Sequence, residues 1–349
     1  MSTNTITLRI SCHCKHVSYT YTLPSTAFPL KSSICSCNIC RHSTGLLAAS
    51  YAVIPSPDRP DVSHLTSYAS SSTLTRFFCP KCGAHVGNFE EGEWEFATGL
   101  LDRTEGLLDR VLMWMEDTKD GGVASWLTEL PEGMKYKRML RDRDSAEVSD
   151  EALLRMEKGA AAIIGSGSGP DKDQSRLYAS CHCGGIQFYI TRPSEHTPCD
   201  KKRGKWWLRG SGNQYLAKND SCTSCRLVTG FELISWTYLP QQNIFSLDGS
   251  PLTLSTDTSL TTLAHYDSSP GVHREFCSKC GATMFYRNDN REPQIIDIGV
   301  GLFKSESGAR AEDWFSWDTG KVSYAEDAID KYLPKSLLQG MSDWAQTVN

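Results

Sequence analysis

The chain is dominated by short runs in which apolar and polar residues alternate. Residues 17–21 and 186–190 alternate in this way, and Gly and Pro interrupt the pattern at short intervals. A period of two places successive side chains on opposite faces of a strand. Two longer apolar runs, 46–54 and 231–239, are typical of buried strands. We therefore predict a mainly β protein made of folded antiparallel sheets.

Two segments depart from this β pattern. Residues 137–157 are rich in charge and indicate a helix, and residues 165–170 contain only Gly, Ser and Pro, a composition typical of a flexible linker. The final stretch, 324–349, indicates a helix that Pro334 interrupts. The charged helix and the linker therefore separate two β-rich halves.

The two halves are copies of each other. Their landmarks recur in the same order: 11–15 with 180–184, 17–21 with 186–190, 35–41 with 220–226, 78–84 with 276–282, 99–101 with 301–303, and 117–118 with 318–319. Insertions in the second copy, chiefly around residues 197–212, explain the changing distance between partners. We predict two tandem domains, 1–136 and 175–349, joined by the helix and linker at 137–174.

Charge and hydropathy exclude several classes of protein. The net charge is −5, and no run of Lys and Arg is longer than 201–203, which argues against a nucleic-acid partner. No apolar stretch approaches the roughly 20 residues that span a bilayer. The N-terminus lacks the basic start and apolar core of a secretory signal. We therefore expect a cytoplasmic protein whose 14 cysteines bind metal and do not form disulfides.

Each copy contains one C-x-C pair and one C-x-x-C-G pair. Such pairs place thiolates on tight turns, and two pairs together complete a tetrahedral zinc site. The competing interpretation is buried apolar cysteines, which does not explain two pairs that recur at matching spacing. The predicted four-thiolate structural sites are Cys12, Cys14, Cys79 and Cys82 in the first copy, and Cys181, Cys183, Cys277 and Cys280 in the second.

A third motif lies between these pairs in the first copy. Cys35, Cys37 and Cys40 have no fourth cysteine, so a zinc bound to them keeps a position open for water or substrate. Two alternatives remain. The zinc could be structural, with His42 or His85 as its fourth ligand, or the three thiols could carry out redox chemistry.

The second copy differs at this central motif. Asp220 replaces the first cysteine and leaves Cys222 and Cys225 as the only thiols. A carboxylate can bind zinc, but this set holds the ion less tightly, and we expect the second site to be degenerate. Cys199, the one unpaired cysteine, could supply a missing ligand, although an ordinary free thiol is the simpler expectation.

Together these motifs resemble the glutathione-dependent formaldehyde-activating enzyme family, which shares its domain with centromere protein V. The family pattern runs S-C-H-C-G, then C-x-C-S-x-C-R, then F-C-x-x-C-G. The first copy departs from it at Lys15 and Asn38, and the second departs at Asp220. The resemblance covers nearly the whole chain apart from the linker and the C-terminal tail.

The resemblance implies folded antiparallel sheets pinned by the four-thiolate zinc. It also implies zinc-dependent carbon–sulfur lyase chemistry on a glutathione or other thiol adduct, such as S-hydroxymethylglutathione, with the three-thiolate zinc as the catalytic metal. His42 and His85 are the nearest candidates for proton transfer. Arg41, whose counterpart is Arg226, is a candidate for binding a substrate carboxylate, with a surface salt bridge as the alternative.

The duplication suggests a substrate larger than a formaldehyde adduct, because one domain suffices for that. The aromatic pair at 206–207, inside the insertion, fits a larger small-molecule substrate. The rival hypothesis is a non-catalytic zinc scaffold that binds a protein partner. An exchangeable ligand on the central zinc, and loss of turnover without loss of folding in Cys37→Ser, would distinguish the enzyme from the scaffold.

Overall fold

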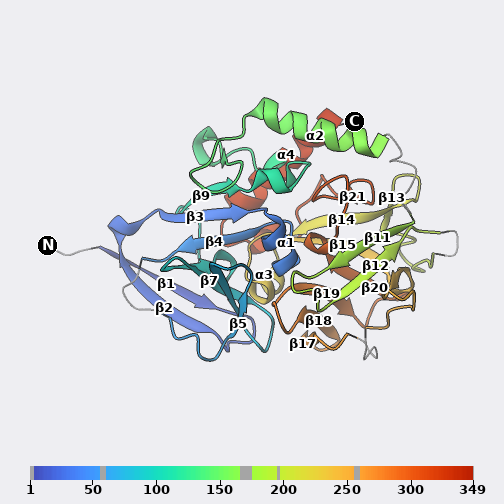
Figure 1. Ribbon diagram of the computed structural model, residues 1–349, viewed down its shortest axis with the longest axis horizontal. Coiled ribbons are helices and arrows are strands. Elements are labelled where there is room, and N and C mark those ends of the chain that lie inside the picture. The colour runs from blue at the N-terminus through green and yellow to red at the C-terminus, as the bar shows by residue number, and fades with distance from the viewer. Residues whose placement is uncertain (1–3, 56–59, 166–174, 195–196, 255–259, 349) are drawn as a thin grey trace.

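The structure is a computed structural model that describes residues 4–55, 60–165, 175–194, 197–254 and 260–348. Strands dominate the described residues, which confirms the mainly β prediction. Each repeat contains one small sheet and one large sheet. The first repeat lies on one side of the molecule and the second repeat on the other (Figure 1).

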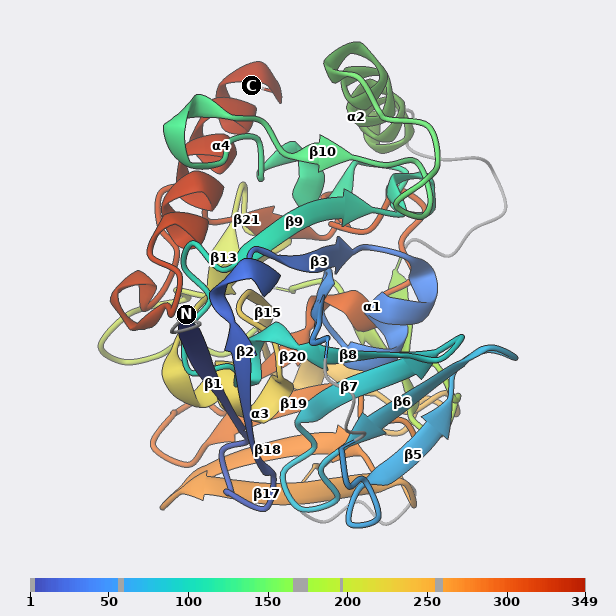
Figure 2. The ribbon, with the colours of Figure 1, turned by 90° about the vertical axis from the view of Figure 1, so that its left-hand side faces the viewer.

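The first repeat opens with a hairpin of two strands, β1 (Thr5–Ser11) and β2 (Ser18–Pro24). Its large sheet has the order β10-β9-β3-β4-β8-β7-β6-β5, in which only β3–β9 and β9–β10 are parallel. Figure 2 shows these strands side by side from β9 down to β5. The members are β3 (Leu30–Cys35), β4 (Ala49–Val53), β5 (Thr66–Ala69), β6 (Leu74–Phe78), β7 (His85–Glu90), β8 (Glu93–Ala97), β9 (Leu108–Met113) and β10 (Lys137–Arg138).

The second repeat follows the same plan. Its small sheet contains β11 (Arg176–Ser180), β12 (Gln187–Thr191) and β16 (Ile244–Phe245). Its large sheet has the order β13-β14-β15-β20-β19-β18-β17, and β21 runs parallel to β14 as β9 does to β3. The members are β13 (Leu208–Arg209), β14 (Gln214–Asp220), β15 (Ile234–Pro240), β17 (Leu263–Ser269), β18 (Val272–Cys277), β19 (Thr283–Asn288), β20 (Ile295–Gly299) and β21 (Phe315–Trp317).

The helix between the repeats begins later than the sequence predicts. α2 spans Asp150–Gly165, and residues 137–138 form strand β10 instead. Ser149 sets this start because its Oγ accepts a hydrogen bond from Ala152 N at 3.2 Å, as an N-cap does. Two acidic residues follow in the first turn, where the helix dipole favours them. The predicted linker, 165–170, lies almost wholly outside the described residues.

The C-terminal helix, α4 (Tyr332–Val348), is not interrupted by Pro334, which lies in its first turn, where no N–H is needed. This helix returns to the first repeat: Ser336 Oγ donates to Glu129 O at 2.6 Å, and the Trp344 and Trp126 ring centres lie 5.8 Å apart. α2 and α4 occupy the same end of the molecule (Figures 1 and 2).

The two repeats contact each other through matching residues. Gly99 N donates to Gly230 O at 2.9 Å, and the equivalent Gly301 N donates to Gly45 O at 3.0 Å. A Cβ on Gly301 would lie 2.1 Å from Leu46 O, so the backbones meet too closely for a side chain. The interface therefore has approximate two-fold symmetry inside one chain.

Histidines and tyrosines repeat this symmetry. His13 Nδ1 lies 2.6 Å from Tyr266 Oη, and His182 Nδ1 lies 2.6 Å from Tyr68 Oη. Each histidine belongs to the C-x-C turn of one repeat, and each tyrosine belongs to an edge strand of the other. The four-cysteine turns are thereby tied to the opposite repeat, and one apolar core contains residues from both.

Candidate metal centres and a cavity in the second repeat

The C-x-C and C-x-x-C pairs of the first repeat meet as predicted. Their four sulfurs lie within 4.8 Å of one another, with Cys12 Sγ 3.5 Å from Cys14 Sγ and Cys14 Sγ 3.6 Å from Cys79 Sγ. The turn after β1 supplies one pair, and the turn between β6 and β7 supplies the other. Val17 N points at Cys12 Sγ at 3.4 Å, as backbone amides do toward zinc-bound thiolates. Four convergent sulfurs are a donor set that fits zinc.

The second repeat forms the same cluster. The four sulfurs of Cys181, Cys183, Cys277 and Cys280 also lie within 4.8 Å of one another. Cys183 Sγ is 3.5 Å from both Cys181 Sγ and Cys277 Sγ, and Ile186 N points at Cys181 Sγ at 3.4 Å. Each repeat therefore holds one four-cysteine group that could bind zinc.

The central motif of the first repeat lies where β3 meets α1 (Asn38–Thr44). Cys35 ends the strand, and Cys37 is the helix N-cap, whose sulfur accepts a hydrogen bond from Cys40 N at 3.2 Å. Asp117 holds the same turn from outside, because its Oδ2 accepts from Asn38 N at 2.8 Å. The three sulfurs lie within 4.8 Å of one another, and no fourth cysteine, histidine or carboxylate joins them among the described residues.

A buried arginine that the sequence analysis missed faces this motif. Arg76 is 1% exposed, and its Nη2 donates to Cys40 Sγ at 3.2 Å. Its other nitrogens donate to Tyr51 Oη and Ser70 Oγ, both at 3.0 Å. The pKa of Cys40 is held well below its ordinary value by hydrogen bonds from the Cys35 and Cys37 thiols and by the Arg76 charge. Arg76 thus stabilises a thiolate at this centre.

The second repeat keeps this arrangement with a carboxylate in it. Asp220 ends β14, and Cys222 is the N-cap of α3 (Thr223–Thr229), with its sulfur accepting from Cys225 N at 3.3 Å. The three donors lie within 4.8 Å of one another. Arg274, the counterpart of Arg76, places Nη1 3.5 Å and Nη2 3.6 Å from Cys225 Sγ. Comparing R-F-F-C at 76–79 with R-E-F-C at 274–277 would have revealed both arginines.

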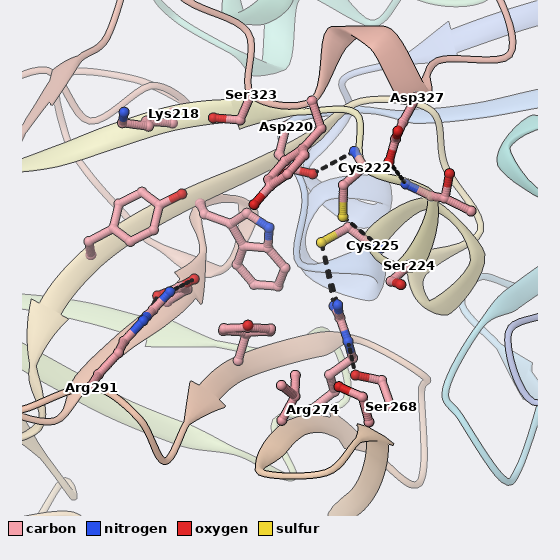
Figure 3. Close-up of a pocket in the computed structure, with 18 of the residues that line it drawn as sticks. Lys218, Asp220, Cys222, Ser224, Cys225, Ser268, Arg274, Arg291, Ser323 and Asp327 are labelled. Atoms are coloured by element: carbon pink, nitrogen blue, oxygen red, sulfur yellow. Dashed lines mark hydrogen bonds and ion pairs between the residues drawn. The ribbon is translucent and has the colours of Figure 1, made fainter.

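A cavity of about 770 Å³ opens on this second centre. Asp220, Cys222 and Cys225 gather at one side of it, with Arg274 reaching Cys225 (Figure 3). Its wall combines polar and charged residues with five aromatic ones: Trp206, Trp236, Tyr238, Tyr286 and Tyr324. The second repeat thus has three donors gathered beside a cavity of ligand size, and the degeneracy of this centre stays a prediction.

Comparison with protein families decides the affiliation of the chain. The sequence profile of the family described as glutathione-dependent formaldehyde-activating enzyme matches residues 7–117 and 207–317, more than half of the chain. The protein belongs to this family. Comparisons with curated proteins and with solved structures found no match.

The two matches confirm the tandem arrangement of formaldehyde-activating domains. The second match begins at residue 207 and so leaves out Cys181 and Cys183, which the structure nevertheless joins to Cys277 and Cys280. The structure also corrects one landmark of the repeat. The counterpart of Asp117 is Asp327, not Asp318, because Asp327 Oδ2 accepts from Thr223 N at 3.0 Å, as Asp117 does from Asn38 N.

The arginines that end the family's central motif are buried, not on the surface. Arg41 is 4% exposed, and its Nη2 donates to Asn38 Oδ1 at 2.5 Å. Its counterpart Arg226 donates to the carbonyl oxygens of Gly99 and Leu101 in the other repeat. The alternative of a surface salt bridge is therefore wrong. Recognition of a substrate carboxylate by Arg41 stays a prediction.

The two histidines face the interface between the repeats. His85 is fully buried, its carbonyl oxygen lies against Gly230, and burial lowers its pKa to about 3. Burial and the nearby Arg41 charge lower the pKa of His42 to about 3 as well. Both imidazoles are therefore neutral near pH 7, and neither joins a cysteine cluster among the described residues. Their role in proton transfer stays a prediction.

Two further observations concern residues outside the cysteine clusters. Cys199 is exposed and lies outside every metal-ligand cluster found among the described residues. None of the helices in the described part of the chain is both long and apolar enough to cross a membrane.

Proposed function

We propose that this protein is a zinc-dependent carbon–sulfur lyase that acts on a glutathione or other thiol adduct through Cys35, Cys37 and Cys40. The observation that carries this proposal is the convergence of three sulfurs, with no fourth protein ligand among the described residues, beside the buried cation of Arg76. The family, whose description names glutathione and formaldehyde, supports the reaction class.

The donor set fits zinc, because three cysteine sulfurs within 4.8 Å match its preference for thiolates. When bound there, zinc supplies a Lewis acid with one position that the protein does not fill. The chain itself contributes the charge balance. Arg76 offsets the negative charge that three thiolates bring into a buried site, and Ser70 and Tyr51 fix its guanidinium.

The proposed reaction needs no oxidant. In the direction of synthesis, the thiol loses a proton and its sulfur bonds to the aldehyde carbon, while the carbonyl π electrons move to oxygen, which gains a proton. Cleavage is the reverse and releases a thiolate, which takes up a proton. The residues around Cys40 suit this chemistry because Arg76 favours negative charge on sulfur.

The test compares Cys37→Ser with Cys199→Ser, which changes an exposed cysteine outside every described cluster. Exchange between formaldehyde and glutathione can be followed by NMR, and zinc per chain by elemental mass spectrometry. We expect Cys37→Ser to lose one zinc and about 100-fold or more in turnover, as when other enzymes lose an electrostatic stabiliser. Unchanged circular dichroism would show that folding persists. Normal turnover in Cys37→Ser would exclude the first-repeat centre.

A further inference from the structure

We infer that the second repeat holds its own ligand site, in which Asp220, Cys222 and Cys225 bind a metal ion at the side of a cavity that accepts a ring-bearing thiol or its adduct. The sulfur of this ligand faces the three donors. The inference rests on the proposed function for its sulfur chemistry, but it concerns a different centre and a different class of substrate.

The case for a metal ion begins with Asp220. This carboxylate is 6% exposed, and its Oδ1 accepts a hydrogen bond from Cys222 N at 2.8 Å. No Lys, Arg or His forms an ion pair with it in the part of the chain that the structure describes; the guanidinium of Arg274 is engaged with Cys225. A buried carboxylate without a cation is costly, and a metal ion shared with two thiolates removes that cost.

The second repeat differs from the first around this centre. Strand register places Trp236 where the first repeat has Tyr51, since Asp220 pairs with Ile234 as Cys35 pairs with Ala49. Tyr51 binds Arg76 through its hydroxyl group, which an indole ring at position 236 lacks. Arg274 donates hydrogen bonds to Ser268 and Cys225, and its guanidinium carbon lies 5.0 Å from the Tyr286 ring centre.

An insertion that the first repeat lacks builds one wall of the cavity. Its Trp206 ring centre lies 5.4 Å from that of Tyr238. The guanidinium carbon of Arg291 lies 5.9 Å from the Trp206 ring centre and 5.2 Å from the Tyr286 ring centre. Trp206 Nε1 is buried and has no hydrogen-bond partner among the described residues. Tilted aromatic rings with a guanidinium group nearby favour a planar ring as the ligand.

The charged side chains in the cavity wall favour a ring-bearing thiol as the ligand over a peptide such as glutathione. Three of the five cations in the wall already have carboxylate partners: Arg203 pairs with Asp200 at 3.3 Å, Lys218 pairs with Asp318 at 2.8 Å, and Arg291 pairs with Asp297. Arg274 is engaged with Cys225, which leaves Lys321 as the one wall cation without an ion pair among the described residues. Glutathione carries two carboxylates, which need unpaired cations. A volume of about 770 Å³ lies in the range of pockets for small organic ligands. The site therefore favours an aromatic thiol over glutathione.

The experiment uses the full chain loaded with Co²⁺, because thiolate ligands on cobalt give charge-transfer absorption. The probe is phenylmethanethiol, and glutathione is the comparison. We expect phenylmethanethiol to increase the charge-transfer band and to bind at least about 10-fold more tightly than glutathione. The comparison is made in Cys35→Ala, which removes one thiolate from the first-repeat centre; the increase should persist there, and adding Asp220→Ala should abolish it. Trp206→Ala should weaken binding about 10-fold, while Trp94→Ala, outside the cavity, should not.

Several outcomes would overturn the inference. The increase could be lost in Cys35→Ala or kept when Asp220→Ala is added, glutathione could bind as tightly as the aromatic thiol, or neither thiol could change the spectrum. If Asp220→Ala does not fold, Asp220→Cys is used in its place. This variant should shift the cobalt bands, because it adds a third thiolate to the second-repeat centre. An unchanged spectrum would count against a metal ion at this centre. Failure of the proposed function is distinguishable, because it appears as normal turnover in Cys37→Ser whatever the binding result.

Discussion

At the scale of single residues, the central motifs depend on one buried arginine each. Arg76 and Arg274 come from equivalent strands and reach the last cysteine of their motif. The two arginines differ in their other hydrogen bonds. Arg76 also donates to the hydroxyl groups of Tyr51 and Ser70, whereas Arg274 also donates to that of Ser268. A thiolate cluster without its cation is an uncompensated buried charge. The arginines are therefore part of the candidate metal centres, as charge partners of the thiolates and not as metal ligands.

Replacing Arg76 with Ala should destabilise the protein by about 3–5 kcal/mol, the range for removing one partner of a buried ion pair. It should also lower the affinity of the central site for zinc, because the thiolates then repel one another. Urea unfolding and competitive chelation measure the two effects. The control is Arg9→Ala, whose side chain is 75% exposed and should change neither. Unchanged zinc affinity in Arg76→Ala would contradict the charge-balance argument.

The sequence predicted the cysteine clusters but not these arginines, for a physical reason. Cysteine pairs at fixed spacing indicate a tetrahedral metal site, because short turns bring their sulfurs together in any fold. Arg76, on β6, reaches Cys40, on α1, only through the tertiary structure. The position of a single arginine in a strand does not predict such a contact. Asp327 was missed for a similar reason. The local sequence around Asp318 resembles that around Asp117 more closely, whereas the contact of Asp327 with Thr223 depends on tertiary structure.

At the scale of elements, the β17–β18 hairpin edge of the second repeat contains a pH-sensitive contact. His273 Nδ1 lies 2.6 Å from Asp267 Oδ1, and Nε2 lies 2.9 Å from Asp289 Oδ2. Hydrogen bonds to Asp289 and Asp267 raise the pKa of His273, although burial and the nearby Arg287 charge oppose them. The protonated imidazole can donate to both carboxylates at once, whereas the neutral ring can donate to only one.

His273 should therefore stabilise the protein at low pH. Because its folded pKa exceeds the ordinary value of 6.5, its contribution is fully present below that pH and is lost as the pH rises through the folded pKa. His273→Gln should lower the melting temperature at about pH 5.5 and have little effect at about pH 8.5. Both carboxylates are more than half exposed, so we expect less than about 1 kcal/mol. An equal effect at both pH values would contradict this.

The elements were more predictable than their ends. Period-two patterns located β2 and β12, because one face of each must meet the core, and continuous apolar runs located the buried strands after each central motif. The start of α2 was predicted too early, because charge alone does not mark where a helix begins and the Ser149 cap does. The return of α4 to the first repeat depends on contacts that sequence periodicity does not contain.

At the scale of the whole molecule, the repeats meet through backbone contacts that exclude side chains. A Cβ on Gly99 would lie 2.4 Å from Phe231 N, and one on Gly301 would lie 2.1 Å from Leu46 O. In an alanine variant, contacts this short would force the backbones apart. Each Gly→Ala change should therefore lower the free energy of unfolding by about 1–3 kcal/mol. Gly159→Ala, in α2 with nothing within 4 Å, should be neutral or stabilising by about 1 kcal/mol. Thermal unfolding of the three variants checks this, and equal melting temperatures would contradict a tight interface.

The crossed contacts of the four-cysteine turns lead to a prediction about metal removal. The turn that holds Cys14 is tied through His13 to Tyr266, and the turn that holds Cys183 is tied through His182 to Tyr68. Loss of zinc from either turn should loosen an edge of the opposite repeat, so the repeats should unfold together. Cys82→Ser and Cys280→Ser should each lose one zinc and lower a single melting transition that both repeats share.

The contrasting case is a chain of two independent domains. Each serine variant would then show two transitions, one shifted and one unchanged, because zinc would stabilise only the repeat that binds it. Calorimetry with zinc analysis separates the two cases. Tyr68→Phe with Tyr266→Phe removes the crossed hydroxyl contacts while leaving all eight cysteines, and it should weaken the coupling without loss of zinc. If that double variant keeps one sharp transition, the shared core and the glycine contacts, not the crossed turns, join the two repeats.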